Sequence, residues 1–143
     1  MKEILFDALA SGRGEHILFV DDEPAICALA QTFLERLGYR VTAHTDPEEA
    51  LAQFHEAPDQ FALVLTNLIM PRMTGVQLAK RISQVRPRLP IVMVTGFSGA
   101  WTLAKLREFG IRDLISKPMT LAMLAAAVRR ALLAAANEGS THD

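Results

Sequence analysis

The sequence has almost no cysteine and no surplus of either charge. Cys27 is the single cysteine among 143 residues, which excludes an internal disulfide and is typical of a reducing compartment. We expect it on one face of an early helix, as a small buried hydrophobe rather than a nucleophile. Fifteen basic residues against sixteen acidic ones give a net charge of −1. Composition therefore gives no electrostatic reason to expect binding to nucleic acid or to a membrane surface.

The sequence also lacks a long apolar run. No stretch approaches the roughly 18 to 20 residues that span a bilayer. The opening MKEILFDALASGRG is not a signal peptide, because Asp7 interrupts its apolar stretch. We therefore expect a cytoplasmic chain without a membrane segment. Residues 1–14 are interpreted as a leader and linker ending in Ser-Gly-Arg-Gly, residues 15–136 as one domain, and residues 137–143 as a disordered tail.

Strand and helix patterns alternate regularly between residues 15 and 136. Wholly apolar runs predict strands buried on both faces, as in a parallel sheet, at 17–20, 61–66 and 90–95. More polar strands are predicted at 39–45 and 112–116, and helices at 24–37, 46–56, 74–85, 100–109 and 120–136. Five such units predict a doubly wound α/β sheet with helices on both faces. The strand order 2-1-3-4-5 is the natural candidate, although the pattern alone does not fix it.

Polar side chains stand where four of these strands end. Asp21 and Asp22 follow the first strand, Asn67 follows the third, Thr95 ends the fourth and Lys117 follows the fifth. Ligands of open α/β sheets bind beyond the carboxyl ends of the strands. Each residue also has an ordinary local explanation: a helix cap, a turn residue, a strand end or a solvated loop lysine. Their convergence on one edge of the sheet favours a binding site.

The motifs at these strand ends resemble the receiver domain of two-component response regulators. They are ILFVDDEP (17–24), LVLTNLIMPRMTG (63–75), IVMVTGFS (91–98) and LISKP (114–118). The resemblance extends from residue 16 to about residue 136, and it implies a flavodoxin-like five-stranded sheet in the order 2-1-3-4-5. Three segments are most similar to receivers attached to hybrid sensor histidine kinases: GRGEHILFVDDEP, TGFS and ISKP.

The resemblance also implies a phosphoacceptor and a metal site. In this family, an aspartate at the end of the third strand accepts a phosphoryl group, and this sequence has Asn67 there. Mg²⁺ would be bound directly by Asp22, through water by Asp21, and by Asn67 and the backbone carbonyl of Ile69. An amide has no negative charge and is not a competent nucleophile. We therefore expect weak Mg²⁺ binding and no phosphorylation at Asn67.

The resemblance assigns roles at the remaining strand ends. Thr95 would donate its hydroxyl to a phosphoryl oxygen, and Lys117 would neutralise charge on the transferring group. The Lys117–Pro118 bond is often cis in this family. Leu114 occupies the switch position, which is often aromatic, so the usual ring movement cannot operate. Phe97 is interpreted as packing on the next helix rather than gating the pocket.

These features predict a signalling module of a two-component phosphorelay and not an enzyme. The expected partner is a histidine kinase or a histidine phosphotransfer protein, and a second copy of the chain is a further candidate. Neither nucleic acid nor a membrane is expected to bind directly. With no effector domain expected before or after the receiver, its output would act through protein contacts.

Several alternatives stay open. The chain could be a natural pseudo-receiver that acts independently of phosphorylation, or a fragment of a hybrid histidine kinase. The asparagine could be natural or an engineered replacement. A phosphatase of the haloacid-dehalogenase type is disfavoured, because Glu23 rather than a second aspartate stands two positions after Asp21. A flavodoxin-like cofactor binder is disfavoured because no phosphate loop follows the first strand.

Overall fold

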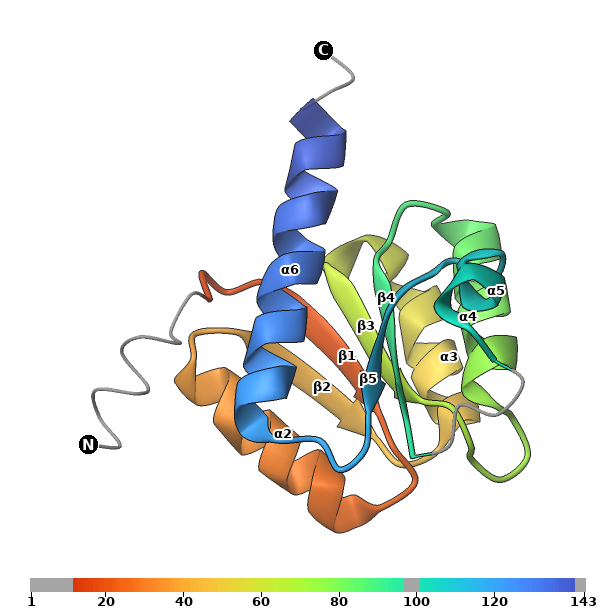
Figure 1. Cartoon of the computed structure of the whole chain (residues 1–143), viewed down its shortest axis with the longest axis horizontal. Coiled ribbons are helices and arrows are strands. Elements are labelled where there is room, and N and C mark those ends of the chain that lie inside the picture. Colours follow the sequence, from red (N-terminus) through yellow and green to blue (C-terminus); the bar gives the residue numbers. More distant parts are fainter. Residues whose placement is uncertain (1–11, 97–100, 141–143) are drawn as a thin grey trace.

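A computed structural model describes residues 12–96 and 101–140 of the chain, in which strands and helices alternate (Figure 1). The elements in chain order are β1 (His16–Val20), α2 (Pro24–Arg36), β2 (Arg40–His44), α3 (Pro47–Glu56), the 3₁₀ turn η1 (Pro58–Gln60), β3 (Leu63–Asn67), α4 (Gly75–Val85), β4 (Ile91–Thr95), α5 (Leu103–Arg107), β5 (Ile111–Ser116) and α6 (Leu121–Ser140). The predicted strand-helix alternation is therefore confirmed.

The five strands form one parallel sheet in the order β2-β1-β3-β4-β5, which confirms the predicted order. In the register of the central pair, Val20 lies opposite Thr66. The next residues, Asp21 and Asn67, therefore leave the sheet side by side. Thr95 ends β4 one residue beyond Val94, the partner of Asn67. The register thus brings the polar strand ends to one edge.

Each face of the sheet has its own apolar core. Ile17 and Phe19 of β1 pack into the core under α2 and α6, whereas Leu18 and Val20 pack into the core under α3, α4 and α5. Figure 1 shows these two helical layers on opposite sides of the sheet. Because alternate residues of a strand point to opposite faces, a strand buried on both faces must be apolar throughout. The helices thereby hold the strand ends in fixed positions.

Some boundaries differ from those predicted. Helix α5 is shorter than the predicted 100–109, and α6 continues to Ser140, into the predicted tail. Within that extension, Arg112 of β5 forms an ion pair with Glu138. Residues 1–11 and 141–143 and the predicted role of Phe97 lie outside the described residues. In the part described, no helix combines the length and hydropathy needed to cross a bilayer.

Candidate functional site

Asp21 is the most buried acid at this edge of the sheet. Its exposed fraction is 2%, and its Oδ1 accepts a hydrogen bond from the backbone N–H of Glu23 at 2.9 Å. This bond supports the turn that leads into α2. Asp21 therefore also has a local structural role at the start of this helix, as the sequence allowed. Burial raises the pKa of the Asp21 carboxyl, and the Glu23 N–H and the Lys117 ammonium oppose that rise in part.

Asn67 is the last residue of β3, and its exposed fraction is 7%. Its Nδ2 donates to Oδ1 of Asp22 at 3.2 Å and to the backbone carbonyl of Ile69 at 3.1 Å. A carboxylate and a carbonyl both accept hydrogen bonds and donate none. The nitrogen end of the amide must therefore face them, because the oxygen end would meet two other acceptors. Three of the four predicted metal ligands are thus connected through the Asn67 amide.

Thr95 and Lys117 occupy the neighbouring strand ends. Thr95 is buried, and its carbonyl accepts a hydrogen bond from the backbone N–H of Lys117 at 2.8 Å. A Cβ atom added at Gly96 would lie 3.6 Å from both Cβ and Cδ of Lys117, so the lysine side chain runs beside this glycine. The Lys117–Pro118 bond is cis, as predicted. Lys117 and Asp21 line the same cavity of about 290 Å³.

Gly75 has a structural role that the sequence motif did not reveal. Its N–H donates to the carbonyl of Leu68 at 2.8 Å, and a Cβ at this position would lie 2.3 Å from the backbone oxygen of Asn67. Helix α4 can therefore begin directly against the end of β3 only with glycine there. Thr74 and Gln77 form a capping box at the same helix start. The spacing T-G-V-Q is the signal that identifies this helix start in the sequence.

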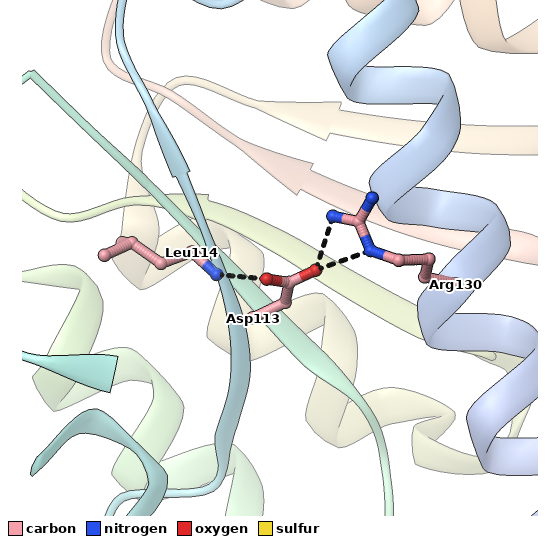
Figure 2. A network of polar contacts seen from close by, with 3 residues as sticks. All are labelled: Asp113, Leu114 and Arg130. Carbon is pink, nitrogen blue, oxygen red and sulfur yellow. Dashed lines mark hydrogen bonds and ion pairs between the residues drawn. The ribbon is translucent and has the colours of Figure 1, made fainter. Parts of the chain in front are cut away.

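The predicted switch residue, Leu114, lies on β5 and is partly buried against the apolar core under α3, α4 and α5. Figure 2 shows the adjacent polar network: the backbone N–H of Leu114 donates to Oδ1 of Asp113 at 2.9 Å. The other carboxylate oxygen of Asp113 accepts from Arg130 of α6, at 2.8 Å from Nη2 and 3.2 Å from Nε. The strand that contains the switch position is therefore connected to the last helix.

The donor set at the strand ends does not fit Mg²⁺ in this arrangement. Mg²⁺ requires oxygen ligands directed at the ion. Here the hydrogens of the Asn67 amide are directed at the Asp22 carboxylate and the Ile69 carbonyl. Among the described residues, no group of three or more His, Cys, Asp or Glu side chains is placed to hold a metal ion.

The fold and the polar strand ends agree with comparisons to known proteins. The response regulator receiver domain matches residues 17–129. The chain belongs to this family. This receiver is 34% identical over 116 residues to the transcriptional regulatory protein ZraR of Salmonella typhimurium, which covers 81% of the chain and 26% of ZraR. It is 31% identical over 121 residues to the response regulator receiver protein CpdR of Brucella abortus, covering 85% of the chain and 99% of CpdR.

Solved structures support the same fold. The CheY-like receiver domain protein of Methanospirillum hungatei JF-1 superimposes with a TM-score of 0.81 at 28% identity, covering 87% of this receiver and 98% of that protein. Receiver domains are signalling modules that interact with histidine kinases and phosphotransfer proteins, and they typically bind Mg²⁺. None of these three proteins distinguishes receivers of hybrid kinases from other receivers.

Proposed function

We propose that this receiver takes part in two-component signalling without being phosphorylated, because Asn67 replaces the phosphoacceptor aspartate. The observation that supports this most directly is the position of Asn67. It ends β3 and contacts Asp22 through its side chain. An aspartate at this place would offer a negatively charged oxygen to a phosphoryl group. The amide offers none, since its nitrogen lone pair is delocalised into the carbonyl.

The other residues of the pocket would keep the positions needed for phosphoryl transfer, although the transfer itself does not take place. Thr95 would present its hydroxyl and Lys117 its ammonium to a phosphoryl group, and Leu114 would occupy the switch position. Asp21, Asp22 and the carbonyl of Ile69 would contribute the oxygens of a metal site, which Asn67 weakens. Phosphoryl transfer depends on positioning and charge as well as on a nucleophile. Restoring an aspartate at position 67 should therefore be enough to restore phosphoryl transfer.

The signalling output would come from protein contacts that do not depend on phosphorylation. A histidine kinase or a histidine phosphotransfer protein is the proposed partner, with a second copy of the chain as another candidate. These partners and the lone thiol of Cys27 would place the receiver in the cytoplasm. The matched region is 26% of ZraR but 99% of CpdR, so similar receivers occur both within longer proteins and almost alone. The alternative that this receiver is part of a hybrid histidine kinase is therefore retained.

Intact-mass spectrometry with a small phosphodonor and Mg²⁺ tests this proposal. The unaltered receiver should gain no phosphoryl group, whereas Asn67→Asp should gain one that maps to position 67. Asn137→Asp is the matched control, since it makes the same chemical change on the exposed side of α6 and should stay unlabelled. A phosphoryl group mapped to Asn67 itself, with no deamidation, would contradict the proposal.

A further inference from the structure

The Asn67 amide joins two groups that have no hydrogen to offer each other. The first is Oδ1 of Asp22, a residue just after β1, and the second is the carbonyl of Ile69 in the loop after β3. Two such acceptors can be held together only by a cation or by a group with two hydrogens. The amide nitrogen has two hydrogens and lies 3.2 Å from the first acceptor and 3.1 Å from the second.

We propose that the nitrogen of Asn67 takes the place of the divalent cation, so that this receiver completes its pocket without Mg²⁺. The inference rests on the proposed function, because it concerns the same asparagine. It goes beyond a loss of phosphorylation, since it assigns the side chain a positive structural role. Asn67 acts as a fixed bridge between β1 and the loop that follows β3.

The loop after β3 is held in place by hydrogen bonds within the protein, as a bridge from Asn67 requires. The Ile69 side chain is 65% exposed, yet its carbonyl accepts from the buried amide. The N–H of Leu68 donates to the carbonyl of Val94 at 2.9 Å, and the carbonyl of Leu68 accepts from Gly75 at 2.8 Å. Hydrogen bonds within the chain therefore fix Leu68, the residue before Ile69, and close the loop at Gly75, while the Asn67 amide adds the link to Asp22.

Mg²⁺ would have to displace this bridge in order to bind. The amide would turn by about half a rotation, so that its oxygen replaced its nitrogen, and both hydrogen bonds would break. The oxygen then presented would be the end of a dipole rather than an anion. Because the number of charged ligands tunes the affinity of oxygen sites, Mg²⁺ at concentrations that bind Asn67→Asp should leave the unaltered receiver essentially unoccupied.

Thermal unfolding with chelator and with increasing Mg²⁺ gives the first test. The unaltered receiver should unfold at the same temperature throughout. Asn67→Asp should unfold at a lower temperature in chelator and gain stability as Mg²⁺ is added, because it brings a further carboxylate beside Asp21 and Asp22. If Asn67→Asp gains nothing from Mg²⁺, the atom at position 67 does not decide metal binding and the inference is wrong.

The side-chain amide resonances of Asn67 give the decisive test by NMR. Both hydrogens should exchange slowly with solvent compared with an exposed amide such as Gln84, and Mg²⁺ should leave them unmoved. Asp22→Asn keeps an acceptor and should preserve this protection, whereas Asp22→Ala removes it and should speed exchange. A saturable Mg²⁺-dependent shift of the Asn67 resonances would overturn the inference. That outcome would leave the absence of phosphorylation intact, since the mass measurement tests it separately.

Discussion

Asn67 differs from aspartate by one atom, and that atom changes the charge and the hydrogen bonding of the pocket together. The sequence predicted where this residue lies, because the end of an apolar strand in a parallel sheet is a recognisable place. It did not predict which end of the amide faces Asp22. That orientation depends on the Ile69 carbonyl, whose position is set by the loop hydrogen bonds and by the approach of Gly75.

His16 provides a prediction at the same scale, concerning pH. Its Nε2 lies 2.7 Å from Oγ1 of Thr42, its ring centroid lies 4.8 Å from that of Phe61, and its buried Nδ1 has no partner in the described structure. Burial, and secondly the charge of Arg40, lower the pKa of His16 below its ordinary value of 6.5. The unfolded chain therefore binds this proton more readily than the folded one.

Stability should accordingly decrease as the pH falls from 6.5 towards the folded pKa of His16. Above that window this contribution should be constant. Urea unfolding across the window should show a steeper loss for the unaltered receiver than for His16→Gln, which keeps a polar side chain but cannot titrate. Parallel pH profiles for the two proteins would show that His16 is not the titrating group.

At the scale of single elements, periodicity identified every strand and the long helices, but tertiary contacts set their ends. Helix α6 extends past residue 136 where Arg112 reaches Glu138, and Asp113 binds Arg130 about two turns earlier in the same helix. Composition could not reveal these pairings, because the partners are 26 and 17 residues apart in sequence. Asp46 shows the opposite case, since it caps the start of α3 by accepting from the N–H of Glu48, only two residues away in sequence.

The start of α4 gives a prediction for an element. Thr74 Oγ1 accepts from the N–H of Gln77 at 3.2 Å, and the Gln77 side chain accepts from the N–H of Thr74 at 2.9 Å. Thr74→Ala should lower the free energy of unfolding by about 1 kcal/mol, because the helix start loses its side-chain cap. Thr74→Ser keeps the oxygen and should lose much less. Equal losses for the two variants in urea unfolding would contradict the capping explanation.

At the scale of the whole molecule, the sheet with a core on each face places five separate segments at one edge. Wholly apolar strands indicated a sheet covered on both faces, and the motifs at the strand ends supplied the order by resemblance. The pocket follows from this arrangement, since Asp21, Asn67 and Thr95 are buried where β1, β3 and β4 end. The surface that meets a partner could not be predicted in the same way, because it depends on a second molecule.

Beryllofluoride tests the central claim at this scale, because this phosphoryl analogue completes its coordination with a carboxylate oxygen. Backbone amide NMR spectra would be compared with Mg²⁺ and fluoride alone and after beryllium is added. The unaltered receiver should show no further change, whereas Asn67→Asp should show saturable shifts at Thr95, Gly96 and Lys117. Saturable shifts at these residues in the unaltered receiver would show that the pocket accepts a phosphoryl group despite Asn67, and would contradict the central claim.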